Sequence, residues 1–295
     1  MNGKYVVGVD IGGSHVTASL VDMAARTIVN GSQIRRAVDP HAAAEDIINN
    51  WSEVIKQVAT VFEDKPYYTG IAMPGPFDYE KGISLIKGFN KYESLYELNV
   101  KEMLAQVLGI APGNISLKND AAAFLQGEIF CGAAAGYNKA IGLTLGTGLG
   151  SAHAQGLFTK ECAVNVSSLH EGRAEDYISI LWFRHRYHEL TGYMPSSVKY
   201  IADRIGEDSA AARVFDEFST NLSIVLKRFI KEEEPDIVVL GGGIANAFDI
   251  FYPTLQLKLG DAVRVPVKQS VLGEDAAMAG AAGNWIHTIQ QSTIL

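Results

Sequence analysis

The chain carries one short pattern twice, and this repeat limits the folds that it can adopt. Residues 7–14 read VGVDIGGS and residues 141–148 read IGLTLGTG, and the two align without a gap. Each copy is an apolar strand that runs into a tight turn of small residues and out into a second strand. Such a turn leaves backbone N–H groups facing a concavity that suits phosphate oxygens. Two copies predict two lobes that share one phosphate chain.

Size and composition narrow the function. The chain has 295 residues, of which 47% are hydrophobic, and a net charge of −8. It can therefore bury two cores, but it lacks the excess of cations that nucleic acids or anionic membranes require. No apolar run approaches the ~18 residues that span a bilayer. The first turn lies close to the N-terminus, which leaves no room for a leader peptide or a DNA-binding module. We expect a cytoplasmic protein without nucleic-acid or membrane partners, whose anionic ligands are held by backbone amides and a metal ion.

Hydrophobic periodicity predicts a similar order of elements in the two halves. Strands at 4–10, 16–22 and 27–35 are expected to form an antiparallel meander, and a helix with apolar residues up to Phe62 should follow from a first turn near Pro40. Further strands are expected at 68–72, 115–118, 140–144 and up to 154, then a helix at 214–229, a last strand at 236–240 and another helix. The pattern restarts near Lys118, so we place the boundary between a smaller lobe, 1–118, and a larger lobe, 119–279, at that residue.

Asp10 stands at the end of the first apolar strand, beside the amides of Gly12 and Gly13. A carboxylate in this position can bind Mg²⁺ through water. It can equally hydrogen-bond its own turn. The second copy favours a ligand site, because Thr144 and Thr147 offer hydroxyl groups in the matching place.

Asn119 and Asp120 lie just beyond another strand and open a helix of small residues. An Asp at this point can accept the proton of a substrate hydroxyl. Asn and Asp more commonly cap a helix there, and the pattern alone favours capping. Three glycines, 241–243, follow the last strand, where they suit either the close approach of a flat ligand such as adenine or a tight connection to a helix.

The cysteines and histidines offer little local metal chemistry. Cys131 and Cys162 are the only cysteines, too few for a disulfide framework or a cysteine zinc site. His185 and His188 would share one face of a helix, but the neighbouring arginines disfavour a bound cation.

Together these motifs resemble the ROK family of bacterial sugar kinases, over almost the whole chain and in order. The matching segments are VDIGGSH at 9–15, GIAMPGP at 70–76, LKNDA at 117–121, LGTGLG at 145–150, VLGGGI at 239–244, and LGEDA at 272–276 with GAA at 280–282. The resemblance implies an α/β protein with the two-lobed actin-like ATPase (ribonuclease H-like) fold, built of duplicated mixed sheets flanked by helices. It also implies that a C-terminal helix, 280–295, packs back on the first lobe.

The resemblance also implies roles for individual residues. Asp120 matches the general base, and Asp10 the residue that serves Mg²⁺. The implied sugar contacts are Asn90, Asn119, Gly75 and Glu175, and the implied ATP contacts are Gly12, Gly13, Ser14, Thr144, Gly146, Thr147, Gly148, Gly242 and Gly243.

One segment departs from the family pattern. Many members carry a Glu-x-Gly-His element followed by a cysteine-rich zinc loop, whereas here residues 158–179 are shortened and keep only Gly172, Glu175, Tyr177 and Ser179 in register. His170 is a candidate replacement for the missing histidine, or an incidental loop residue. Since Cys162 and His170 fall short of the four ligands of a closed zinc site, we expect no structural zinc.

The sequence thus predicts an ATP-dependent kinase that phosphorylates a hydroxyl of a hexose or a related sugar, with ATP and Mg²⁺ as the cofactors. Two alternatives stay open. One is a sugar or nucleotide sensor of the same fold with impaired catalysis, and the other is a kinase for a metabolite that is not a sugar. The resemblance further implies a homodimer.

Overall fold

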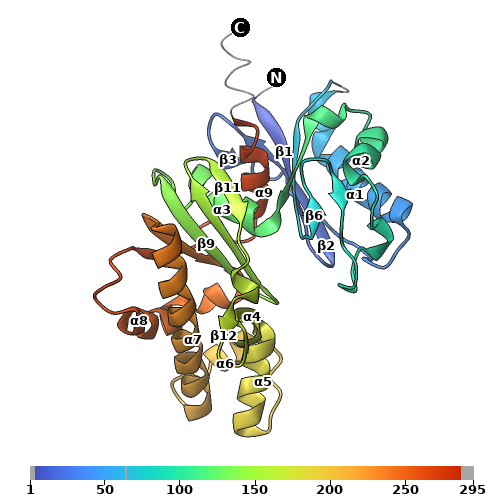
Figure 1. The fold of residues 1–295 in the computed structure, drawn as a ribbon. Coiled ribbons are helices and arrows are strands. Elements are labelled where there is room, and N and C mark those ends of the chain that lie inside the picture. The colour runs from blue at the N-terminus through green and yellow to red at the C-terminus, as the bar shows by residue number, and fades with distance from the viewer. Residues whose placement is uncertain (1–3, 64, 287–295) are drawn as a thin grey trace. The chain divides into compact units, whose positions relative to one another are not determined.

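The computed structural model describes residues 4–63 and 65–286, and it divides into two compact units (Figure 1). The first unit contains the chain up to Ala135 and again from Glu274, and the second is Gly136–Gly273. Each unit is built on a mixed sheet with helices around it, so the predicted fold class is confirmed. Among the described residues, no helix combines the length and the apolar character needed to cross a membrane.

The first sheet has the strand order β3-β2-β1-β5-β8, with β4 also paired to β2. Its long strands are β1 (Tyr5–Ile11), β2 (His15–Asp22), β5 (Thr69–Met73) and β8 (Ile115–Asn119). The β1–β2 hairpin is antiparallel, whereas β1, β5 and β8 run parallel. The three parallel strands therefore all end at one edge of this sheet.

The predicted third strand, 27–35, is interrupted. It consists of β3 (Thr27–Ile28) and β4 (Ile34–Ala37), which pair with different parts of β2. Between them the Ser32 hydroxyl oxygen accepts a hydrogen bond from the Leu20 N–H at 3.0 Å and lies 2.7 Å from the Ser19 hydroxyl. The Ser32 hydroxyl therefore takes the place of a backbone carbonyl as the partner of the Leu20 N–H, and the regular pairing with β2 stops at this point.

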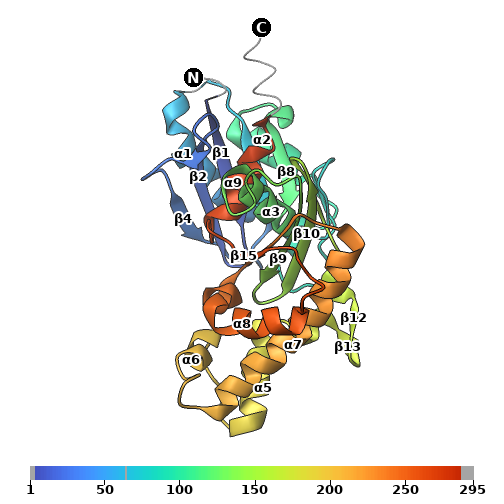
Figure 2. The same cartoon turned by 90° about the vertical axis from the view of Figure 1, so that its left-hand side faces the viewer.

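Helices cover both faces of the first sheet. On one face lie α1 (Ala44–Ala59) and α2 (Val100–Leu108), and the apolar stripe of α1 is buried as predicted. The helix starts at Ala44 rather than near Pro40, whose carbonyl instead accepts a hydrogen bond from the Tyr92 N–H. On the other face, α3 (Asp120–Cys131) and α9 (Asp275–Gly283) lie side by side (Figure 2).

Four glycines permit the close packing of α9 on α3 and on the sheet. A Cβ on Gly280 would lie 1.8 Å from the Ala123 carbonyl oxygen, and one on Gly70 would lie 2.0 Å from that of Ala281. Gly8 and Gly127 meet the backbone of α9 in the same way. Trp285 closes this contact, since its indole N–H donates to the Thr69 carbonyl at 3.1 Å.

This packing explains why the unit boundary lies after Ala135, beyond α3, whereas the sequence suggested Lys118. Because α3 packs on α9 and on β5, it belongs to the first unit by its contacts. The expected return of the closing helix to the first unit is observed for α9, and residues 287–295 of the predicted helix 280–295 lie outside the described residues.

The second sheet has the order β11-β10-β9-β14-β15. Its strands are β9 (Lys139–Leu145), β10 (Leu149–Gln155), β11 (Phe158–Glu161), β14 (Ile237–Gly241) and β15 (Val267–Gln269). As in the first sheet, a hairpin leads into parallel strands, here β9, β14 and β15. The prediction of β14 as the last strand was wrong, because β15 follows it and extends the sheet.

The helices of the second unit share one aromatic core. They are α4 (Ala174–Tyr177), α5 (Ile180–Thr191), α6 (Val198–Ala202), α7 (Ser209–Glu233) and α8 (Phe248–Leu259). Phe218 of α7 is fully buried, with its ring centroid 4.7 Å from that of Phe183 and 5.3 Å from that of Phe251. The remaining strands form two short hairpins. In the first unit, β6 (Phe77–Asp78) pairs with β7 (Ile83–Ser84). In the second unit, β12 (Ser168–Leu169) pairs with β13 (Gly172–Arg173).

Candidate active site

Polar residues gather where the parallel strands of the first sheet end. Asp10 in β1 is level with Ala72 in β5, which is level with Lys118 in β8. Asn119 and Asp120 therefore follow at the same edge of the sheet as Asp10. The topology thus brings together residues that are about 110 positions apart in the sequence (120 minus 10).

The first turn, Gly12–Ser14, is held from both sides. The Gly12 N–H donates to the His15 carbonyl at 2.9 Å, and the Tyr92 hydroxyl donates to the Gly12 carbonyl at 2.5 Å. A Cβ on Gly12 would find no atom closer than 3.5 Å, and Gly12 has no positive φ angle. Neither the backbone nor the packing therefore demands glycine here, and the space beside the turn remains free for ligand atoms.

Asn119 caps α3 and thereby places Asp120 in its first turn. The Asn119 side-chain oxygen accepts hydrogen bonds from the N–H groups of Ala121 at 2.9 Å and Ala122 at 3.1 Å. Capping by Asn119, one of the two readings of this segment, is therefore observed. Asp120 stays exposed. Dehydration by the surrounding protein raises the pKa of Asp120, and the positive charge of the nearby Lys91 lowers it. Because solvent reaches the carboxylate, the rise in its pKa is limited.

Asp10 is partly buried in a negative environment. Burial, followed by the charges of Asp120 and Glu274, raises the pKa of Asp10 to about 7, against a smaller opposing effect of Arg35. A divalent cation would relieve this repulsion, and oxygen ligands of this kind suit Mg²⁺. The donor set at this edge therefore fits the magnesium site that the resemblance implies.

Tyr79 links two of the predicted sugar contacts. The Asn119 amide donates to the Tyr79 hydroxyl at 3.3 Å, and a Cβ on Gly75 would lie 3.0 Å from the same oxygen. Asn90, another predicted contact, is exposed, and its N–H donates to the Glu93 carboxylate at 3.0 Å. Its φ angle is positive, at 55°.

Sequence reasoning missed Tyr79, Lys91 and Tyr92, which the structure places beside the predicted residues. They lie in a connection without a recognisable motif. The only signal was the proximity of Lys91 and Tyr92 to Asn90 in the sequence.

The second turn, Gly146–Gly148, also joins two antiparallel strands, but the connection is one residue shorter, because Leu145 pairs with Leu149 whereas Ile11 pairs with Val16. The Gly146 N–H donates to the Gly148 carbonyl at 3.0 Å, and the Gly146 carbonyl accepts from the Ile180 N–H at 2.9 Å. A Cβ on Gly146 would come no closer than 3.9 Å to other atoms. Thr147 is exposed at the tip and Thr144 is partly exposed in β9. This turn also has open space where phosphate oxygens could meet N–H and O–H donors.

Gly242 lies against this turn for a steric reason. Gly241 in β14 pairs with Thr144, and a Cβ on Gly242 would lie only 2.5 Å from the Leu145 carbonyl oxygen. Gly242 also has a φ angle of 85°, which side chains rarely adopt. Gly243 begins a short 3₁₀ helix, Gly243–Ala247. The two predicted nucleotide contacts of this connection therefore lie next to the second turn.

Glu175 and His170 contact different parts of the second unit. The Glu175 carboxylate accepts a hydrogen bond from the Leu149 N–H at 2.8 Å, so it supports the second turn directly. His170 lies in the β12–β13 turn with its Nε2 2.8 Å from the Asn221 side-chain oxygen, and its ring packs edge-on against Tyr177. In this structure His170 is thus attached to α7.

Comparisons with known proteins agree with this architecture. A model of the ROK family matches residues 6–157, which is more than half of the chain. A glucokinase of Thermotoga maritima is 27% identical over 319 aligned positions, covering 94% of this chain and 96% of the relative. The crystal structure of a ROK hexokinase from Thermus thermophilus superposes with a TM-score of 0.81 at 20% identity, covering 97% of this chain and 99% of that one. A ROK glucokinase from Streptomyces griseus, solved with glucose and AMPPNP, gives a TM-score of 0.75 at 22% identity, with 94% and 98% covered. The chain, with its two matching turns and its Asn119-Asp120 segment, belongs to the ROK family.

Proposed function

We propose that the protein is an ATP-dependent kinase that phosphorylates a hydroxyl group of a hexose. The observation that carries this proposal is the position of Asp120, which is accessible, begins α3 and lies at the same sheet edge as Asp10. The ROK relatives named as a glucokinase and a hexokinase, and the one solved with glucose and AMPPNP, support a hexose and ATP.

Asp120 is the general base of the proposed reaction. It accepts the proton of the sugar hydroxyl as that oxygen attacks the terminal phosphoryl group. Its raised pKa makes the carboxylate a better proton acceptor than an ordinary Asp. Asn119 fixes the start of α3 through its cap and so orients the base.

The two turns bind phosphate through backbone N–H groups, and Thr147 adds a hydroxyl donor in the second. Mg²⁺, when bound, neutralises charge on the polyphosphate. Asp10 would hold this ion, directly or through water, and its ionisation is favoured by the cation. Gly242 and Gly243 let the adenosine approach the backbone beside the second turn.

The sugar contacts proposed are Asn90, Asn119, Gly75, Glu175 and His170. Asn119 has a hydrogen-bond partner in Tyr79, which restricts its amide orientation. The shortened segment 158–179 removes the family's Glu-x-Gly-His element, so this set is smaller than in many members. The preference among hexoses, amino sugars and N-acetylated sugars depends on this segment.

A coupled assay of ADP release over these three classes of sugar tests the proposal. We expect sugar-dependent ADP release with a hexose, requiring Mg²⁺. Release with an N-acetylated sugar alone would change the substrate class. ADP release only with a metabolite that is not a sugar would refute the sugar assignment.

The shortened segment also favours a second candidate, a sensor that binds sugar or nucleotide without turnover. Calorimetric binding of glucose in the absence of any ADP release would support the sensor and refute the kinase. Retention of Asp120 argues for the kinase.

A further inference from the structure

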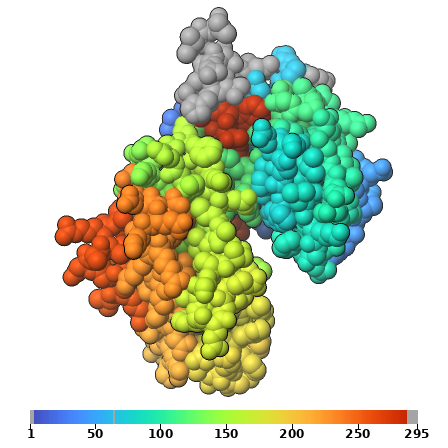
Figure 3. Space-filling model, in the orientation of Figure 1, coloured from blue at the N-terminus to red at the C-terminus, as the bar shows by residue number. Residues whose placement is uncertain are grey.

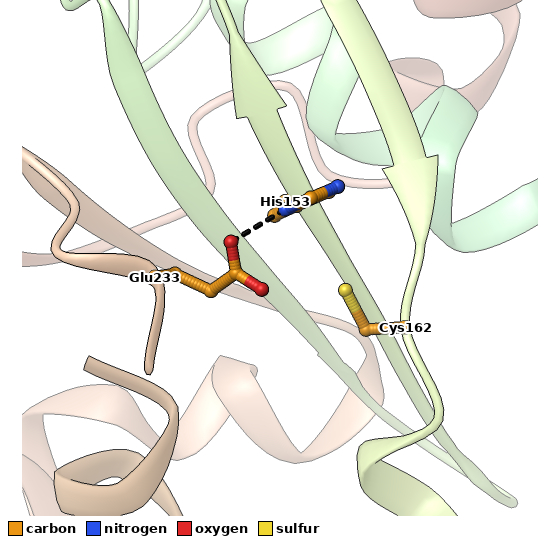
Figure 4. A group of neighbouring side chains, drawn as sticks. All are labelled: His153, Cys162 and Glu233. Carbon is orange, nitrogen blue, oxygen red and sulfur yellow. Dashed lines mark hydrogen bonds and ion pairs between the residues drawn. The ribbon is translucent and has the colours of Figure 1, made fainter. Parts of the chain in front are cut away.

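Three potential metal ligands converge on the second sheet, on elements that carry none of the proposed ATP or sugar contacts. His153 lies in β10, Cys162 directly follows β11, and Glu233 is the last residue of α7. His153 Nδ1 is 2.5 Å from the Glu233 carboxylate, and one donor atom of each of the three residues lies within 4.8 Å of the others. Figure 4 shows the imidazole and carboxylate in contact, with the Cys162 sulfur directed toward the same space.

The backbone holds these residues firmly in place. The Cys162 N–H donates to the Ser151 carbonyl at 2.8 Å, and the Ser151 hydroxyl donates back to the Cys162 carbonyl at 2.8 Å. His153 pairs in register with Lys160 on the neighbouring strand. The following residue, Glu234, ends α7 with a left-handed conformation. The three side chains are therefore presented by rigid elements, which a metal site requires.

Solvent can reach the cluster. The side chains of His153 and Glu233 are 36% and 23% exposed, and the three residues line an indentation of about 420 Å³. Figure 3 shows the surface of α7 meeting the β11 segment on this face of the second unit. The other charged residues of the indentation nearly balance, since Lys160 and Arg228 oppose Glu161 and Glu232. A cation that approaches the cluster therefore meets no net charge repulsion from these four residues.

From this geometry we propose that His153 Nδ1, Cys162 Sγ and a Glu233 carboxylate oxygen bind one divalent cation of the zinc class, with water as the fourth ligand. A nitrogen, a sulfur and an oxygen ligand together suit Zn²⁺ and disfavour Mg²⁺ or Ca²⁺, which prefer oxygen alone. The ion displaces the proton shared by His153 and Glu233 and the proton of the thiol, and both protons pass to solvent. A small separation of the imidazole from the carboxylate makes room for it.

The ion would anchor the shortened segment. Cys162 begins the stretch that contains His170 in the β12–β13 turn and leads on to Glu175. Metal binding at Cys162 ties the start of this stretch to β10 and to the end of α7. We assign the site a structural role on this basis.

This inference replaces the expectation of a protein without structural zinc. That expectation counted the ligands inside the segment, Cys162 and His170, and could not include His153 and Glu233, which are 80 residues apart (233 minus 153). His170 is engaged with Asn221 and takes no part in the cluster.

Cobalt titration of the chelator-treated full chain tests the site without reference to activity. One equivalent of Co²⁺ should give a thiolate-to-metal charge-transfer band in the near ultraviolet, which excess Zn²⁺ should abolish. Because the chain has two cysteines, Cys162→Ala should remove the band and Cys131→Ala should keep it. Glu233→Gln and His153→Gln should each weaken binding at least about tenfold.

Absence of the band at one equivalent, or its persistence in Cys162→Ala, would overturn the site and leave a histidine–glutamate hydrogen bond beside a thiol. Circular dichroism of each variant must match that of the unmodified chain. His185→Ala, an exposed histidine of α5, is the control for unspecific histidine binding.

Hydrogen exchange tests the structural role. Zn²⁺ should slow amide exchange in peptides from residues 158–171 in the unmodified chain, and should not do so in Cys162→Ala. Peptides from α1 should not respond. Metal binding without any change in residues 158–171 would refute the anchoring role while keeping the site, and neither outcome depends on the kinase proposal.

Discussion

The two matching turns both join antiparallel strands through glycine, but they differ in length and in the charge of the residue that precedes them. Asp10 of the first turn corresponds to Thr144 of the second, since both lie two residues before the turn's first glycine. Both are partly buried near the ends of equivalent strands, β1 and β9. In the first unit, however, a carboxylate is brought near Asp120 and Glu274 and becomes difficult to ionise, whereas the hydroxyl of Thr144 carries no such penalty.

We propose that this difference gives the two turns separate tasks. In the proposed kinase, the carboxylates of Asp10 and Asp120 would serve cation binding and proton transfer, which need charge. In the second turn, Thr144 and Thr147 offer hydroxyl groups beside backbone N–H groups, which would serve phosphate binding, since phosphate needs donors. Under this proposal, the presence of Asp10 in one copy and Thr144 in the other accounts for the two functions.

The largest effect expected is that of Asp120→Asn, which should test the assignment of proton transfer to the first unit. We expect kcat to fall by about 1,000-fold, because the amide cannot accept the proton. The amide keeps the shape of the carboxylate, so sugar affinity measured by calorimetry should stay within about tenfold. A variant that retained more than a few per cent of kcat would identify another base.

The second prediction concerns the open space beside the two turns. Gly12→Val and Gly146→Val should each weaken ATP binding by roughly 100-fold, about 2.7 kcal/mol, because the branched side chain fills the space for phosphate oxygens. Sugar affinity should change by less than about threefold. Binding of a non-hydrolysable ATP analogue and of glucose measures the two effects.

Matched controls are available for both turns. Gly113 and Gly206 also have open surroundings and no positive φ angle, and they lie outside the proposed site. Gly113→Val and Gly206→Val should leave both affinities unchanged. If Gly12→Val or Gly146→Val reduced ATP and sugar binding equally, the turns would have a purely structural purpose.

The third prediction concerns the effect of the Asp10 carboxylate on the free energy of unfolding. The pKa of Asp10 in the folded protein, about 7, lies above its ordinary value of 3.8, so the folded protein binds the proton more tightly than the unfolded chain. The stability from the protonated carboxyl is fully present below about pH 4 and is lost as pH rises through about 7. In metal-free protein, Asp10→Asn should therefore raise the free energy of unfolding by about 1–3 kcal/mol near pH 8, with little gain near pH 4.

Urea unfolding in the presence of a chelator measures this gain at both pH values. Mg²⁺ should then stabilise the unmodified chain and leave Asp10→Asn unaffected. An equal gain at both pH values would show that Asp10 ionises freely, and the contrast with Thr144 would lose its basis.

The smallest effect is expected at Glu175, which supports the second turn through the Leu149 N–H. Glu175→Ala removes the acceptor and should raise the KM for ATP about fivefold, since a hydrogen bond contributes about 1 kcal/mol. Glu175→Gln keeps an acceptor oxygen and should leave that KM nearly unchanged. A rise in the KM for sugar in Glu175→Gln would locate a sugar contact at the same carboxylate, and its absence would limit Glu175 to the turn.

Much of the fold was predictable, because the burial of one face of a strand or helix makes hydrophobic residues recur at a regular spacing in the sequence. The strands around both turns and the stripe of α1 follow from this period. The break between β3 and β4 could not be predicted, because it depends on where the Ser32 hydroxyl finds a backbone partner. The strand β15 was missed because three residues are too few to show alternation.

The candidate site likewise contains residues that the sequence indicated and residues that it did not. Asp10, Asn119 and Asp120 were singled out because each stands at or just beyond the end of an apolar strand, and the parallel pairing of these strands brings their ends to one edge. Lys91 and Tyr92 were missed because their connection has no period, and their contacts follow from how the loop folds. Capping by Asn119 is observed, and it leaves Asp120 available for the proposed role of base.

Because α9 packs closely on the first unit, that unit can complete its fold only after α9 has been synthesised on the ribosome. The first unit needs α9 to cover β1, β5 and α3, and Gly280 and Gly127 allow no substitute with a side chain. Synthesis proceeds at about 5–20 residues per second, so α9 emerges roughly seven to thirty seconds after α3. During this interval the whole of the second unit, Gly136–Gly273, is made and can fold. The nascent first unit meanwhile exposes the sheet face that α9 later covers.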